Sequence, residues 1–350
     1  MEFLEVFKKG DEMYYKEEVQ IKNEKKLKRI LDEYEVPVFI RNFFYKLASK
    51  AAMLNYWSTI KKSIAWFIKN GRINKEKISD ITVDDLEKLK SSDITAYFLY
   101  EKNVQNKELS TINTEKNQLS SFWEYLMNDY GVSKNVIKEV RNNELKVPKT
   151  NRQKIYKLPK EVDLLNMINK IQHKQDEFIR RRNICVLRVL RGTGLRESEL
   201  AGLNIESVDL ENKIGNRAAP CIYVISKGNF CYNERGEDIV YLTKDATNAL
   251  LEWFEFRKTI ENIIDINAVF LNKNGKRMNE KNIQAIFKNY SEGKITPHMM
   301  RHEYITLLSK ECNDIAFVQE QARHKSISTT IINYDSGIGK GNTLNVLSRL

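Results

Sequence analysis

The first half of the chain repeats apolar residues with the period of amphipathic helices. Between Leu54 and Ile68 they recur three or four positions apart, and Gly71 follows as a stop signal. A second stretch begins near Ser110 and stops at Gly131, and the pattern between them predicts one further helix over Val83–Tyr100. We expect the aromatic residues on these stripes to pack in a core rather than stack on bases.

The second half mixes helical periodicity with short apolar runs that are typical of strands. The pattern predicts helices over Lys160–Ile171, Asp176–Arg191 and Lys244–Ile260, and strands over Ile222–Ile225, Ile239–Leu242 and Ala268–Leu271. The remainder is expected to be helical. The glycines of Gly192–Gly194 should end the second helix. The fold class that follows is mainly α, with a small β-sheet in the C-terminal half.

Breaks in the periodicity divide the chain into four segments. Residues 1–35 form a charged, helical extension, residues 36–146 a helical domain, residues 147–157 a linker, and residues 158–350 a second domain. Within the linker, Pro148 blocks continuation of a helix. The linker is also basic, so we expect these side chains to lie along a DNA backbone: Lys149, Arg152 and Lys154.

The net charge is positive, with 58 Lys and Arg against 47 Asp and Glu. Together with 16 Tyr, 15 Phe and 4 Trp, this balance suits a polyanionic partner. A basic cluster near the start, Lys25–Arg29, has two interpretations that the sequence leaves open: a solvated helix face or an arm that faces DNA.

The four cysteines, Cys185, Cys221, Cys231 and Cys312, form no CxxC pair, so they predict neither a zinc site nor a redox motif. No run approaches the roughly 18 apolar residues of a membrane span, and the first residues do not form a signal peptide. We therefore expect a cytoplasmic protein without a membrane partner.

A candidate phosphate site starts at Thr296-Pro297, which is a good N-cap followed by a residue suited to the first helical position. His298 and Arg301 lie three apart, so they share a face near the start of this helix. Imidazole, guanidinium and the free N–H groups of a helix N-terminus can together bind phosphate. The alternative is a structural histidine beside a surface arginine.

Four other residues of the second domain are candidates only in combination. Arg196 follows the glycine break, and Lys227 stands where a strand ends. His324 follows an apolar helix, and Tyr334 ends the segment after it. Each alone has an ordinary interpretation, such as a turn lysine or one tyrosine among 16. Their order along the chain, Arg, Lys, His-x-x-Arg, His and Tyr, carries the information.

This order resembles the tyrosine recombinase family, which includes phage and conjugative-element integrases and the Xer proteins. The resemblance spans nearly all of the second domain, and residues 49–67 and 110–126 resemble the family's helical, SAM-like core-binding domain. It implies a catalytic domain with a small antiparallel sheet. It also implies catalytic roles for Arg196, Lys227, His298, Arg301, His324 and the nucleophile Tyr334, with Glu199 supporting the first arginine and His302 as a structural residue.

The implied chemistry is DNA cleavage through a 3′-phosphotyrosine, without metal or nucleotide cofactor. Two guanidiniums clamp the phosphate oxygens, and a lysine protonates the leaving 5′ oxygen. The chain has no GxxxxGK[ST] loop and no DxD-type carboxylate cluster, which agrees with such a reaction. The implied partner is double-stranded DNA with inverted-repeat core sites, bound by a homotetramer that is a monomer or weak dimer when free.

One departure from the family pattern concerns Arg323, which stands where the family usually has glycine. Its side chain is expected either to add a phosphate contact to DNA or to crowd the turn. Two other functions share part of the pattern: a type IB topoisomerase and a catalytically inactive DNA-binding relative. The sequence leaves open whether a recombinase of this kind integrates and excises a mobile element, resolves dimers or inverts a DNA segment.

Overall fold

The computed structural model describes residues 15–146, 158–211, 219–225, 237–312 and 314–323. Its contacts divide the chain into two compact units, Met1–Lys149 and Thr150–Leu350. The described part is mostly helical with one small antiparallel sheet, so the predicted fold class is confirmed. No helix among the described residues is both long and apolar enough to cross a membrane.

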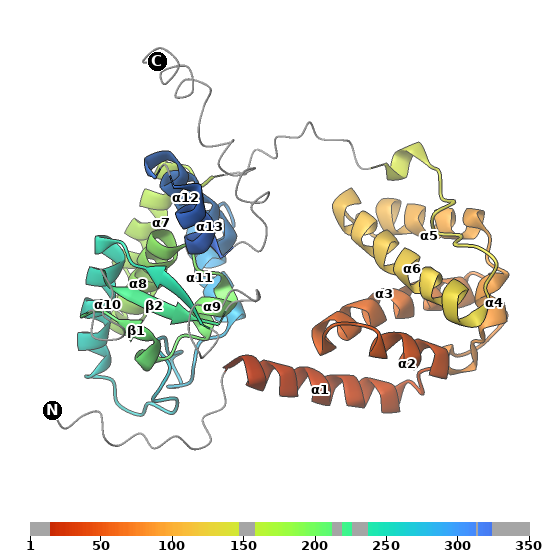
Figure 1. The fold of residues 1–350 in the computed structure, drawn as a ribbon, viewed down its shortest axis with the longest axis horizontal. Helices are drawn as coiled ribbons and strands as arrows, with labels where there is room; N and C mark the ends of the chain where they lie inside the picture. The colour runs from red at the N-terminus through yellow and green to blue at the C-terminus, as the bar shows by residue number, and fades with distance from the viewer. Residues whose placement is uncertain (1–14, 147–157, 212–218, 226–236, 313, 324–350) are drawn as a thin grey trace, which may run out of the picture. The chain divides into compact units, whose positions relative to one another are not determined.

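The described part of the first unit is a helical bundle around one aromatic-rich core (Figure 1). Leu27 of the first helix is buried in this core, whereas the basic cluster Lys25–Arg29 is otherwise exposed around it. The helices are α1 (Tyr15–Glu33), α2 (Val38–Tyr45), α3 (Lys50–Lys69), α4 (Val83–Glu87), α5 (Ser91–Asn103) and α6 (Leu109–Tyr130), with 3-10 turns at Ile78–Asp80 and Asn143–Leu145.

Helices α3 and α6 confirm two of the predicted helices, whereas the stretch between them differs from the prediction. Helix α6 ends at Gly131, whose φ of +73° is the left-handed conformation of a C-cap glycine. The single helix predicted over Val83–Tyr100 is wrong, because the chain forms α4 and α5 instead. The Asp93 carboxylate accepts a 2.9 Å hydrogen bond from the backbone N of Lys90 and starts α5 anew. The break between the helices lets Leu89 join the core.

The second unit surrounds the central helix α8 (Glu177–Thr193), which packs against α7, α10 and α12. The other helices are α7 (Glu161–Gln172), α9 (Glu197–Ala201), α10 (Lys244–Arg257), α11 (Glu280–Ser291), α12 (Pro297–Glu311) and α13 (Ile315–Ala322), with a 3-10 turn at Ile205–Ser207. Figure 1 shows α12 and α13 side by side, and these two helices are in contact.

The sheet of the second unit has the order β1-β2-β3, and both pairings are antiparallel. The strands are β1 (Val208–Asp209), β2 (Cys221–Val224) and β3 (Asp238–Tyr241). Every residue of β2 is buried, which explains why the sequence shows an unbroken apolar run there. Strand β1 escapes prediction because two residues are too few to show a period.

Two further predictions for the second unit need correction. The predicted strand Ala268–Leu271 forms isolated bridges, from Ala268 to Asn204 and from Leu271 to Arg277. All four of its residues are buried, so its apolar character reflects burial rather than a ladder of strands. The helix predicted to reach Ile260 ends at Arg257.

Candidate functional site

Helix α12 begins where the sequence predicts. The hydroxyl of Thr296 accepts a 3.3 Å hydrogen bond from the backbone N of Met299, and Pro297 occupies the first turn. The cap satisfies one free N–H group of the helix, and proline removes a donor that would have no partner there. The first turn therefore carries His298 at a defined position, and the second turn carries Arg301.

The two histidines of α12, His298 and His302, pack edge to face with ring centroids 4.3 Å apart. Although His298 is exposed in part, its partial burial and then the charges of Arg301 and Arg196 lower its pKa below 6.5. Burial, the neighbouring His298 and Arg301 lower the pKa of His302 to about 4. Both imidazoles are therefore neutral at neutral pH in the free protein.

Arg301 is buried, and it ties α12 to two other segments. Its Nη1 donates to the carbonyl oxygen of Gly194 at 2.6 Å, and its Nη2 donates to the carbonyl oxygen of Ala322. Burial, followed by the charges of Arg323 and Arg196, lowers the pKa of Arg301 to about 9. Arg301 is thus still charged at neutral pH, with N–H donors beyond the two that these carbonyls use.

Arg196 lies at the start of α9, directly after the turn that ends α8. Gly194 makes this turn with a φ of +58°, and a Cβ atom there would lie only 2.5 Å from the ring of Tyr304. At the start of α9, the carboxylate of Glu199 accepts hydrogen bonds from the backbone N and from Nη1 of Arg196, at 2.8 and 2.6 Å. About a third of the Arg196 side chain is exposed, so it can still reach a ligand.

Glu199 is the buried anion of this cluster. Burial alone would raise its pKa, but the charges of Arg323, Arg196 and Arg301 outweigh burial and lower the pKa to about 2. The carboxylate is therefore ionised at all ordinary pH values. The sequence predicted that Glu199 supports Arg196, and the structure places the two side chains in direct contact.

Arg323 lies inside the cluster, which is at odds with the predicted contact between its side chain and DNA. Its side chain is 1% exposed, and its Nη2 lies 2.9 Å from Glu199 Oε2 and 2.9 Å from the carbonyl oxygen of Gly194. Its Nη1 donates to the carbonyl oxygen of Gln321 at 2.6 Å. This internal role did not follow from the sequence, where the one signal was a non-glycine residue at a position that is usually glycine in the family.

The structure brings together the predicted residues Arg196, Glu199, His298, Arg301 and His302, and joins Arg323 to them. The other predicted site residues lie outside the described residues: Lys149, Arg152, Lys154, Lys227, His324 and Tyr334. The three arginines and Glu199 hold three positive charges and one negative charge. Such a cluster is suited to bind a phosphate group.

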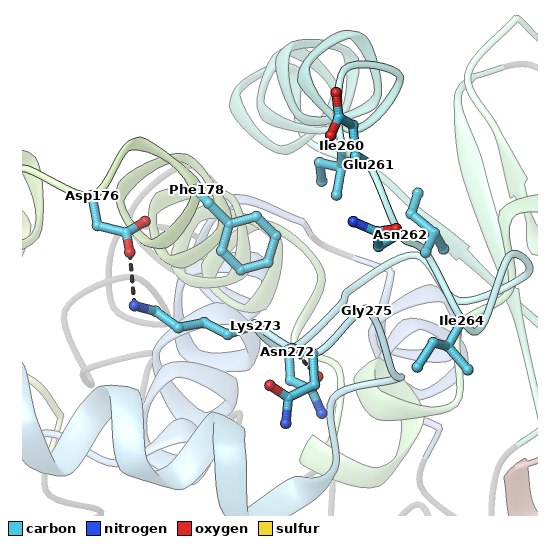
Figure 2. Close-up of a pocket in the computed structure, with 11 residues that line it drawn as sticks. Asp176, Phe178, Ile260, Glu261, Asn262, Ile264, Asn272, Lys273 and Gly275 are labelled. Carbon is cyan, nitrogen blue, oxygen red and sulfur yellow. Dashed lines mark hydrogen bonds and ion pairs between the residues drawn. The ribbon is translucent and has the colours of Figure 1, made fainter.

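The described part also has a cavity away from the arginine cluster, and it has no candidate metal site. No group of three or more His, Cys, Asp or Glu side chains there could hold a metal ion. A cavity of about 790 Å³ opens between the N-terminus of α8 and the segments 260–264 and 272–275, where Lys273 pairs with Asp176 at 2.8 Å (Figure 2). None of the predicted site residues lines this cavity.

Comparison with known proteins agrees with this geometry. The model of the phage integrase family matches residues 160–336, just over half of the chain. A tyrosine recombinase XerC of Thermodesulfovibrio yellowstonii is 25% identical over 282 residues, which cover 78% of this chain and 82% of that protein. A XerC of Pseudomonas entomophila is 33% identical over 195 residues, which cover 54% of this chain and 59% of that protein.

Two solved structures share the fold at low sequence identity. The Tn1549 transposon integrase in complex with transposon right end DNA has a TM-score of 0.61 at 19% identity, and the match covers 84% of this chain and 93% of that one. A lambda integrase dimer bound to a COC′ core site has a TM-score of 0.58 at 12% identity, covering 85% and 94%.

A mainly helical domain that gathers three arginines around one buried carboxylate carries excess positive charge suited to a phosphate group. The chain belongs to the phage integrase family. It is a tyrosine-type recombinase: its partner is DNA, and it recombines DNA site-specifically by cutting and rejoining strands.

Proposed function

We propose that Arg196 and Arg301 clamp the scissile phosphate and that Tyr334 attacks it to form a 3′-phosphotyrosine. One observation carries this proposal: the two arginines, 105 positions apart in the sequence, belong to one hydrogen-bonded cluster. Arg301 donates to the carbonyl oxygen of Gly194, two residues before Arg196. This contact fixes the spacing of the two guanidiniums before DNA binds, which is the preorganisation that stabilises developing charge.

The reaction balances with the residues that the sequence supplies. The phenol oxygen of Tyr334 forms a bond to phosphorus as the bond from phosphorus to the 5′ oxygen breaks. The phenol must lose its proton, because its ordinary pKa is about 10, and His324 or the neutral His298 can accept that proton. Lys227 gives a proton to the leaving 5′ oxygen. Attack by another 5′ hydroxyl then reverses these steps and joins the exchanged strands.

We assign residues 36–146 to core-site binding, residues 147–157 to a linker, and residues 158–350 to catalysis, with residues 1–35 as an extension. Lys149, Arg152 and Lys154 of the linker would contact the DNA backbone. The assembly would be a homotetramer on paired inverted-repeat sites, formed from monomers or weak dimers in the cytoplasm. Its role would be integration and excision of a mobile element or resolution of dimers.

A nicked suicide duplex tests the nucleophile directly. The duplex should carry the inverted repeats mapped in the DNA that flanks the gene, so that cleavage releases a short fragment and traps the covalent complex. We expect the wild type to form this complex and Tyr334→Phe to form none. Tyr290→Phe is the matched control, because it removes a phenol of the same unit outside the arginine cluster, and it should cut like the wild type.

Failure of the wild type to form the complex on the mapped repeats would overturn the proposal. Trapping by Tyr334→Phe at the wild-type rate would overturn the choice of nucleophile. Relaxation of a supercoiled plasmid that lacks the repeats would indicate topoisomerase activity instead of site-specific recombination.

A further inference from the structure

The C-terminus of α13 is held by three arginines. The carbonyl oxygen of Gln321 accepts from Nη1 of Arg323, that of Ala322 accepts from Nη2 of Arg301, and that of Arg323 accepts from Nη2 of Arg196 at 3.3 Å. The last carbonyls of a helix carry partial negative charge and have no partner within the helix. Three consecutive carbonyls therefore fix the two proposed catalytic arginines and Arg323 to one helix end.

Arg323 occupies a backbone conformation that its side chain disfavours. Its φ of +51° is in the left-handed region, where glycine is the favoured residue. Its guanidinium is buried as well, and its Nε has no hydrogen-bond partner in the described part of the chain. Both features cost free energy and persist only where the surroundings determine them strongly. A glycine would end the helix at this position without either cost, so helix termination alone does not explain an arginine here.

The surroundings that hold Arg323 are the groups that hold Arg196 and Arg301. Its Nη2 shares Glu199 with Arg196, and it shares the carbonyl oxygen of Gly194 with Arg301. Because Glu199 pairs with two guanidiniums, its negative charge neutralises that of Arg196 only in part, and the remaining positive charge is available to a phosphate. Arg323 thus adds a charge to the site although its side chain is closed to DNA.

We propose that Arg323 is a positioning residue for strand cleavage. It holds Glu199 and the end of α13 so that Arg196 and Arg301 are fixed and charged before the transition state forms. This inference rests on the proposed function, because it assumes that these two arginines bind the scissile phosphate.

The test separates DNA binding from cleavage in Arg323→Gly and Arg323→Lys, each compared with the wild type on the suicide duplex. Glycine removes the guanidinium and also the backbone strain. We expect the single-turnover cleavage rate of Arg323→Gly at saturating protein to fall at least about tenfold, as loss of electrostatic preorganisation predicts. Its Kd should change less than about threefold, and the salt dependence of Kd should stay the same, because a buried side chain releases no counterions from DNA.

Arg323→Lys should cut at an intermediate rate, because it keeps the charge but not the forked hydrogen bonds. In a Glu199→Gln background, Arg323→Gly should cost several-fold less than it does alone, since the two side chains act through one contact. Arg182→Lys is the matched control. Its buried guanidinium donates to Leu271 and Asn183, outside the cluster, so it should lower stability and leave the cleavage rate unchanged.

Three outcomes overturn the inference. The first is an unchanged cleavage rate in Arg323→Gly, and the second is a loss that is the same with and without Glu199. The third is a Kd that rises as much as the rate falls, with a shallower salt dependence, because that result makes Arg323 a DNA contact. If the wild type cuts and Tyr334→Phe does not, these outcomes leave the proposed function standing. A wild type that cannot cut overturns both.

Discussion

Replacing Glu199 with glutamine tests whether one buried carboxylate holds the arginine cluster together. The side chain keeps its size, and its carbonyl oxygen can still accept from Arg196. The amide nitrogen that replaces Oε2 then faces two donors, the backbone N of Arg196 and Nη2 of Arg323. Three guanidiniums also remain without any compensating negative charge in the cluster. We therefore expect the second unit to lose stability while keeping its fold.

The size of the loss follows from the pKa of Glu199, which the arginines lower from 4.5 to about 2. A fall of this size corresponds to about 3 kcal/mol at neutral pH. Removing one partner of a buried ion pair costs a similar amount, about 3–5 kcal/mol. In a unit of about 200 residues, 3 kcal/mol lowers Tm by roughly 6–12 °C.

Urea unfolding of wild type and Glu199→Gln at several pH values measures this loss. The folded pKa is depressed, so the contribution of the carboxylate is complete above about 4.5 and is lost as pH falls toward about 2. The two proteins should thus differ most at pH 7 and less at pH 3. Glu255→Gln is the control, because its pair with Lys258 is exposed and such pairs contribute about 0–1 kcal/mol. A difference below about 1 kcal/mol at pH 7 would refute the reasoning.

Two other predictions concern the neighbours of this cluster. Gly194→Ala should destabilise the second unit by more than the roughly 1–2 kcal/mol that a left-handed alanine costs, because its Cβ would also meet the Tyr304 ring. Gly131→Ala has open space around it, so in thermal unfolding it should lose only the roughly 1–2 kcal/mol of left-handed backbone strain, and equal losses in the two variants would contradict this reasoning. The pKa of His302 is lowered to about 4, so the free energy of unfolding of the wild type should fall as pH falls from about 6.5 toward 4. In urea unfolding, the free energy of unfolding of His302→Gln should fall less over that pH range, and an equal fall in both proteins would contradict the role of this histidine.

The features that could be predicted from the sequence are those that local chemistry decides. Gly131 and Gly194 end α6 and α8 because a left-handed residue is required there, and Thr296 with Pro297 starts α12. Asp93, whose carboxylate accepts from the backbone N of Lys90, is also a local signal for a helix start, but the apolar period continues across it. The pattern of buried positions continues across a helix break, so periodicity alone joins α4 and α5.

The features that escaped prediction depend on contacts between distant segments. The burial of Arg323 follows from Glu199, 124 positions earlier, and from the carbonyl oxygen of Gly194. A basic residue beside a predicted catalytic histidine is ordinarily interpreted as a DNA contact, because sequence carries charge but not exposure. The order of Arg196, His298 and Arg301 can be recognised in the sequence. The hydrogen bonds by which the last carbonyls of α13 hold Arg196 and Arg301 cannot be recognised there.

The arginine cluster carries more positive charge than its fold neutralises, and this excess explains its construction. Glu199 balances one of three guanidiniums, and the carbonyls of Gly194 and α13 offer only partial charges. Burial first, and then the charges of Arg323 and Arg196, lower the pKa of Arg301 to about 9 and so oppose its ionisation. Under the proposed function, a phosphodiester would supply the missing negative charge, and the phosphorane-like transition state would supply more of it. The contacts that bring these three guanidiniums together would therefore cost stability in the free enzyme and, under the proposed function, would favour the transition state over the bound DNA.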